Sequence, residues 1–114
     1  MMEMFKVKKT VYELRKYYAL PGKWEELLKQ FDEHLVAIFE SHGIISHGYW
    51  RDLEQEDVLV YIVSHNGDPE ENWNAFRTDP RWISIRDSSS MGAKWLVSSI
   101  ESTRLEPTSF SPLG

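Results

Sequence analysis

Six consecutive apolar residues in the middle of the chain constrain its fold more than any other feature. The run extends from Val58 to Val63 and does not alternate between apolar and polar residues. A strand that is apolar on both faces is usually covered on both faces. The run therefore predicts a central strand, within residues 57–65, in a sheet that carries a layer of protein on each side.

A long amphipathic helix is predicted from about residue 23 to residue 41. Pro21 and Gly22 precede it, and His42 and Gly43 form a plausible C-terminal cap. Its apolar residues recur at the i, i+3 and i+4 spacing of one helix face: Trp24, Leu27, Leu28, Phe31, Leu35, Ile38 and Phe39. This stripe is expected to pack against the sheet.

The remaining elements complete an α+β order. Strands are predicted at residues 10–20, 44–52 and 94–105 from their β-branched and aromatic content. One helix carries Trp73 and Phe76, and Asp79 followed by Pro80 caps a shorter one that carries Trp82. The order βαββαβ predicts a ferredoxin-like split β-α-β fold, with an antiparallel sheet and both helices on one face.

The second face of the sheet also needs an apolar cover. No repeat or linker divides the 114 residues, so we expect one domain over residues 1–114, with a core at about 10–106 and a tail at 107–114. All the predicted helices and strands of this chain are already used in the sheet and in the layer on its first face. A second copy of the chain is the natural cover, which predicts a two-fold homodimer with its sheets face to face.

Composition excludes several classes of function. The net charge of −5 argues against nucleic acid or an anionic membrane as a partner, and the absence of cysteine excludes thiol chemistry. The start of the chain lacks the apolar stretch of a signal peptide, so a cytoplasmic protein is expected. Five Trp, five Tyr and five Phe predict a core or a pocket rich in rings.

Three polar residues of the first strand suggest a site. Glu13, Arg15 and Tyr17 are two residues apart and share one face, about 7 Å from each to the next. Tyr12 and Leu14 are suited to pack under the helices, so the polar set is expected to face the second subunit. Glu13 would then act as a base, Arg15 would hold an anionic or enolate oxygen and Tyr17 would donate a hydrogen bond. The alternative is a purely structural ion pair between Glu13 and Arg15.

The histidines carry weaker signals. His47 on the second strand suits a proton shuttle or a haem ligand, but a lone strand histidine is more often a structural residue. His34 and His42 are too far apart on one helix to share a metal, and His65 is interpreted as a strand-end residue. The chain has no His-Glu-x-x-His motif, so no metal is expected, and no phosphate-binding loop or catalytic triad motif is present. No cofactor is expected either. The stripe of Trp73, Phe76 and Trp82 is interpreted as core packing rather than a stacking site.

Four segments in register resemble the NIPSNAP family. They are Tyr12–Tyr17 with Leu20–Lys23; His42 and Gly43 with Gly48, Tyr49 and Trp50; Trp73, Phe76 and Asp79–Trp82; and Leu105–Leu113. The resemblance implies the dimeric α/β-barrel fold, in which two ferredoxin-like sheets enclose a pocket in each subunit. The wider superfamily contains monooxygenases, isomerases, haem enzymes and members with no known reaction, so the resemblance does not supply an activity.

The resulting hypothesis is a homodimer that binds a small, largely apolar molecule in a barrel pocket. Its expected ligand-binding residues are Arg15, Tyr17, Tyr49, Trp50 and Tyr61, and its candidate catalytic residues are Glu13, Arg15, Tyr17 and His47. One alternative is a cofactor-independent monooxygenase or isomerase that acts on a small aromatic or enolisable compound. The other is an assembly or adaptor protein in which the barrel is only the dimer core.

Overall fold

The computed structural model describes residues 10–113 and contains four strands and four α-helices joined by short connections. Its elements are β1 (Val11–Ala19), α1 (Trp24–Gln30), η2 (Phe31–Leu35), α2 (Val36–Ser41), β2 (Ile44–Arg51), β3 (Val58–His65), α3 (Pro69–Arg77), α4 (Pro80–Asp87), η3 (Gly92–Lys94) and β4 (Val97–Leu105). The predicted elements are therefore present in the predicted order. Residues 1–9 and 114 of the expected domain lie outside the described part.

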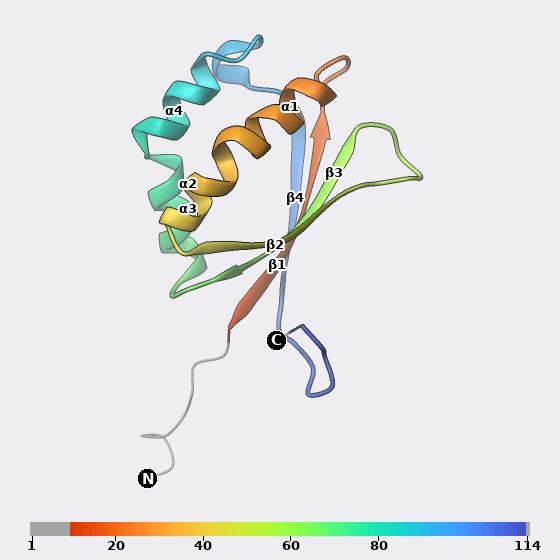
Figure 1. Ribbon diagram of the computed structural model, residues 1–114, viewed down its shortest axis with the longest axis vertical. Coiled ribbons are helices and arrows are strands. Elements are labelled where there is room, and N and C mark those ends of the chain that lie inside the picture. The colour runs from red at the N-terminus through yellow and green to blue at the C-terminus, as the bar shows by residue number, and fades with distance from the viewer. Residues whose placement is uncertain (1–9, 114) are drawn as a thin grey trace.

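The strands form one sheet in the order β2-β3-β1-β4, and every neighbouring pair is antiparallel. β1 and β3 are the central strands, as the doubly apolar run predicted for β3. The helices lie on one face of this sheet (Figure 1). The α+β class is confirmed. None of the helices within residues 10–113 is long and apolar enough to cross a membrane.

The first helical segment carries the core stripe that the sequence predicts. α1, η2 and α2 follow one another directly, and η2 is a single stretch of π-helix in the middle. Six of the seven residues of the predicted stripe are buried, and Leu28 is partly buried against them: Trp24, Leu27, Phe31, Leu35, Ile38 and Phe39 form the buried set. A π-helical turn often marks a functional position in a longer helix, and here it holds Leu35 over the sheet.

Aspartate side chains begin both short helices. The carboxylate of Asp68 accepts a hydrogen bond from Glu71 N at 2.9 Å, and that of Asp79 accepts one from Arg81 N at 2.8 Å. A proline follows each cap at the first helical position, where its missing N–H costs nothing. The predicted cap at Asp79 is confirmed.

The predicted direction of the β1 side chains is wrong. Glu13 and Tyr17 are buried beneath the helices, whereas Tyr12 and Leu14 lie on the opposite face of the sheet. The physical reason is that His65 and Trp73 donate hydrogen bonds to the Glu13 carboxylate on the helix side, where Phe31 and Trp95 also enclose the Tyr17 ring. Tyr17 packs edge-on against Phe31, with ring centroids 5.5 Å apart.

The face away from the helices is only partly covered within the described chain. Leu14, Val60 and Ile62 lie there at intermediate exposure, and 53% of Trp50 is exposed. The C-terminal segment approaches one end of this face, where Leu113 and Ile62 line the same shallow groove.

Candidate functional site

The buried carboxylate of Glu13 organises the polar side of the core. Only 1% of this residue is exposed. Its Oε1 accepts hydrogen bonds from His65 Nε2 and Trp73 Nε1, each at 2.8 Å. Its Oε2 accepts one from Arg15 Nη1 at 2.7 Å and another from the hydroxyl of Ser102. Four donors thus occupy the four lone-pair positions of the carboxylate.

His65 reaches Glu13 from the end of β3. Its Nδ1 lies 3.2 Å from the side-chain amide nitrogen of Asn72, which can only donate. The same amide nitrogen donates to the backbone oxygen of Asn66, which supports this orientation. Nε2 of His65 therefore carries the proton that is donated to Glu13.

Arg15 links the carboxylate to two tyrosines. Its Nε donates to the Tyr61 hydroxyl at 3.0 Å and its Nη2 donates to the Tyr17 hydroxyl at 3.2 Å. The guanidinium carbon lies 4.1 Å from the centroid of the Trp73 ring, close enough for a cation–π interaction. Four separate contacts, counting the ion pair with Glu13, therefore fix the position of this cation.

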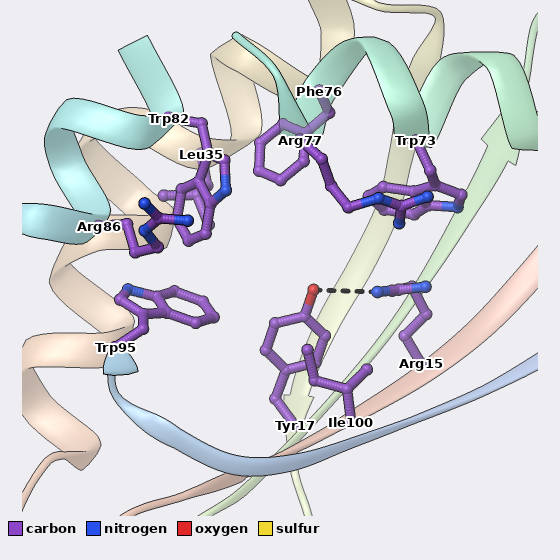
Figure 2. Close-up of a pocket in the computed structure, with 10 residues that line it drawn as sticks. All are labelled: Arg15, Tyr17, Leu35, Trp73, Phe76, Arg77, Trp82, Arg86, Trp95 and Ile100. Carbon is purple, nitrogen blue, oxygen red and sulfur yellow. Dashed lines mark hydrogen bonds between the residues drawn. The ribbon is translucent and has the colours of Figure 1, made fainter. Parts of the chain in front are cut away.

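The Tyr17 hydroxyl remains able to donate a hydrogen bond to a molecule in the cavity. Tyr61 is fully buried, and its hydroxyl donates to Tyr17 at 2.9 Å. The Tyr17 oxygen thus accepts two hydrogen bonds, one from Tyr61 and one from Arg15. Within residues 10–113 no acceptor is placed for its own proton, and Figure 2 shows this hydroxyl at the edge of an open space.

The network sets the charges of its members. Burial alone would raise the pKa of Glu13, but the hydrogen bonds from His65, Ser102, Trp73 and Arg15 outweigh burial and hold the pKa well below its usual range. Burial would lower the pKa of Arg15, but Tyr17, Tyr61 and Glu13 reverse that effect and raise it. Glu13 is therefore a carboxylate and Arg15 a guanidinium at neutral pH.

A cavity of about 230 Å³ lies between the helices and the sheet, open on one side (Figure 2). Its lining comes from β1, η2, α3, α4, β4 and the loop before β4: Arg15, Tyr17, Leu35, Trp73, Phe76, Arg77, Trp82, Arg86, Trp95 and Ile100. Apart from the three arginines, Tyr17 is the only lining residue with a titratable group among those described.

Five of the ten residues that line the cavity are aromatic. Phe76 stacks on Trp82 with centroids 5.1 Å apart, and Trp82 meets Trp95 edge-on at 4.8 Å. Trp73 contacts Phe76 edge-on at 6.0 Å. The predicted packing role of Trp73, Phe76 and Trp82 is confirmed, because all three are buried, and the same side chains also line the cavity.

Trp95 adopts a backbone conformation that is rare for a bulky residue. Its φ is 64° and its ψ is −161°, a region occupied almost only by glycine. Its indole N–H donates to Gln30 Oε1 at 2.6 Å, which fixes the ring against the cavity. Strained positions of this kind cluster at binding and catalytic sites.

The other predicted site residues do not all join this cavity. Tyr49 stacks on Tyr61 with ring centroids 4.9 Å apart, but it is only half-buried on the outer strand β2 and lines a separate cavity of about 260 Å³. Burial raises the pKa of Tyr49 to about 12. Trp50 lies on the opposite face of the sheet. His47 contacts the Tyr12 ring there, and its Nε2 lies 2.7 Å from the Ser64 hydroxyl. Within residues 10–113 no group of three or more His, Asp or Glu side chains is placed to hold a metal ion.

Several site residues have only weak sequence signals. His65 is two residues beyond Val63 and four beyond Tyr61, so strand alternation places it on the same face as Tyr61. Arg77 and Arg86 stand in the last turns of their helices, where basic residues are common for electrostatic reasons alone. No local pattern identifies Trp95 as a cavity residue.

Comparison with known proteins agrees with this architecture. The NIPSNAP family model matches residues 12–112. A NIPSNAP family protein of unknown function from Agrobacterium tumefaciens is 26% identical, with a TM-score of 0.78, and the match covers 93% of this chain and 95% of that one. A second Agrobacterium NIPSNAP structure is also 26% identical, with a TM-score of 0.76 and coverage of 92% and 99%.

A more distant structure shares the fold alone. It comes from Chloroflexus aurantiacus and is provisionally assigned as an antibiotic biosynthesis monooxygenase. It is 18% identical, with a TM-score of 0.63 and coverage of 92% of this chain and 99% of that one. No curated protein matches the chain.

Proposed function

The chain belongs to the NIPSNAP family, and from that premise we propose that it binds a small, largely apolar molecule in the cavity between its helices and its sheet. The observation that carries the proposal is the Tyr17 hydroxyl, which lines the aromatic cavity, accepts two hydrogen bonds and has no acceptor for its own proton among residues 10–113. Binding sites typically combine apolar walls with a few fixed polar groups. A ligand with one acceptor oxygen satisfies this arrangement.

The polar network behind the cavity supports binding rather than proton abstraction. Both oxygens of Glu13 are saturated by donors, and the carboxylate does not line the cavity. A general base needs a free lone pair within reach of the substrate. We therefore assign Glu13 a positioning role, in which it holds Arg15, and through Arg15 the hydroxyl of Tyr17, in place.

A protein that served only as a dimer core would have no need of such a cavity. The backbone strain at Trp95 and the open space beside Tyr17 both cost stability, and selection retains such costs at functional sites. These two features favour ligand binding over a purely structural role.

We further propose that a second copy of the chain covers the opposite face of the sheet. That face carries apolar side chains from β1 and β3, including Leu14, Val60 and Ile62. It also carries both signs of charge, since Lys16 stands opposite Glu101 in the register of β1 and β4. In a two-fold dimer the same surface of each subunit packs against its copy. A surface with apolar residues and charges of both signs can be complementary to its own copy.

Ile62→Asp is expected to convert the dimer into a monomer. A carboxylate within the contact would be buried without a partner, at a cost of several kcal/mol. Sedimentation at micromolar concentration should give twice the 13.4 kDa chain mass for the unmodified protein and a single chain mass for the variant. Ser84→Asp, on the exposed side of α4, is the matched control and should remain dimeric. A 13.4 kDa species for the unmodified protein would contradict the proposal.

The role of Tyr17 is tested with acetophenone, a small aromatic ketone with one acceptor oxygen. Tyr17→Phe should weaken its binding roughly tenfold, as expected for one lost hydrogen bond of about 1.4 kcal/mol. The measurement is the dissociation constant from an NMR titration of each purified variant.

Tyr61→Phe is the matched control for this experiment. It removes a hydroxyl from the same hydrogen-bonded pair, and so disturbs the same network, but it leaves the Tyr17 hydroxyl beside the cavity. Its affinity for acetophenone should stay within about threefold of the unmodified protein. Equal losses in the two variants would show that the network is only structural and would contradict the assignment of Tyr17.

A further inference from the structure

The lining of the cavity has an excess of positive charge. It contains three arginines, and none of its described residues is an aspartate or a glutamate. The chain as a whole has a formal net charge of −5, so the cavity is opposite in sign to the protein around it.

The three guanidinium groups are not equally neutralised. Arg15 forms a 2.7 Å ion pair with the buried carboxylate of Glu13. Arg86 lies 3.0 Å from the half-exposed carboxylate of Asp87. Arg77 donates to the amide oxygen of Asn74 at 2.8 Å and forms no ion pair with any of residues 10–113. An amide oxygen satisfies one donor of Arg77 but does not neutralise its charge, which lies on an exposed side chain at the edge of the cavity.

Arg77 is directed to the polar half of the cavity. In the view of Figure 2 its side chain extends from α3 toward the half that holds Arg15 and the Tyr17 hydroxyl. The opposite half is formed by the rings of Trp82 and Trp95. The cavity is therefore polar and cationic at one end and apolar at the other.

We infer that the cavity binds the anion of a small organic acid, with a carboxylate at the Arg77 end and a flat apolar body between the rings. This inference rests on the proposed function and adds the charge of the ligand to it. The planar guanidinium of Arg77 matches a carboxylate in a two-point contact. The Tyr17 hydroxyl donates to the same carboxylate, and the volume of about 230 Å³ suits a ligand with one or two rings.

Benzoate and benzamide provide a direct comparison, since they have the same ring and nearly the same shape but differ in charge. The unmodified protein should bind benzoate roughly tenfold more tightly than benzamide, the difference expected for a charged hydrogen bond. Added salt should weaken the binding of benzoate and leave that of benzamide almost unchanged.

Two variants locate the charge that recognises the anion. Arg77→Gln should remove most of the preference for benzoate. Arg51→Gln changes the net charge by the same amount at a site outside the cavity, and it should leave the preference intact. NMR titration measures all of these dissociation constants.

The outcomes separate this inference from the proposed function. If benzamide binds as well as benzoate, or if acetophenone binds and benzoate does not, the ligand is not an anion and this inference is overturned while the cavity remains a binding site. A preference for benzoate that survives Arg77→Gln likewise overturns the assignment of Arg77. If none of the three compounds binds, the proposed function fails together with this inference.

Discussion

Glu13→Ala should lower the free energy of unfolding by roughly 3–5 kcal/mol, the cost typical of breaking a buried ion pair. The substitution leaves the guanidinium of Arg15, which is only 11% exposed, without its carboxylate. It also removes the acceptor for His65 and Trp73 in the same buried region. Domains of this size have a free energy of unfolding of about 5–15 kcal/mol, so the substitution would remove a large part of the total stability. Urea unfolding followed by circular dichroism measures the change.

Two further variants distinguish the stranded charge from simple loss of packing. Glu13→Ala combined with Arg15→Leu should be more stable than Glu13→Ala alone, because the second change removes the uncompensated guanidinium. Glu54→Ala, in the exposed turn between β2 and β3, controls for the loss of a carboxylate and should stay within about 0.5 kcal/mol of the unmodified protein. Equal stability of the single and the double variant would show that Glu13 does not compensate Arg15.

Leu35→Ala should cost roughly 2–5 kcal/mol, as other truncations of buried leucines do. Leu35 is buried in the π-helical stretch between α1 and α2, and it lines the cavity. Its removal therefore loses apolar burial and enlarges the empty space above the sheet. Glu33→Ala, on the exposed side of the same turn, should have little effect. Identical melting curves for Leu35→Ala and the unmodified protein would place this part of the stripe outside the core.

The elements were predictable because their signals are local. The core stripe of the first helix follows from spacing alone, and the cap at Asp79 follows from one aspartate before one proline. The central position of β3 follows from its doubly apolar run. Each of these inferences needs only residues that are close together in the chain.

The direction of β1 was not predictable in this way, because both of its faces carry rings. Glu13 faces the helices since its partners lie there, and these partners are distant in sequence. His65, Trp73 and Ser102 lie on β3, α3 and β4, which meet only in the folded chain. Sequence reasoning did group Glu13, Arg15 and Tyr17 correctly, because alternation along a strand is local.

The cavity required the same tertiary information. Its apolar end depends on Trp95, which follows the short η3 helix. The strained backbone of Trp95 is not predicted by any sequence pattern. Its cationic end depends on Arg77, which in the sequence is indistinguishable from an ordinary basic residue at the end of a helix. His47 and Trp50 were expected near the ligand. The register of β2 shifts between Ser46 and Gly48, next to His47, and the alternation of side chains after this shift places Trp50 on the opposite face.

The central claim, that the cavity between the helices and the sheet is the binding site, is tested most directly by the indole N–H signals of the five tryptophans. Trp73, Trp82 and Trp95 line the cavity, whereas Trp24 and Trp50 do not. Titration of the ¹⁵N-labelled protein with acetophenone should shift the three cavity signals along saturable curves and leave the other two in place. Shifts confined to Trp24 or Trp50, or no shift at any of the five, would contradict the claim.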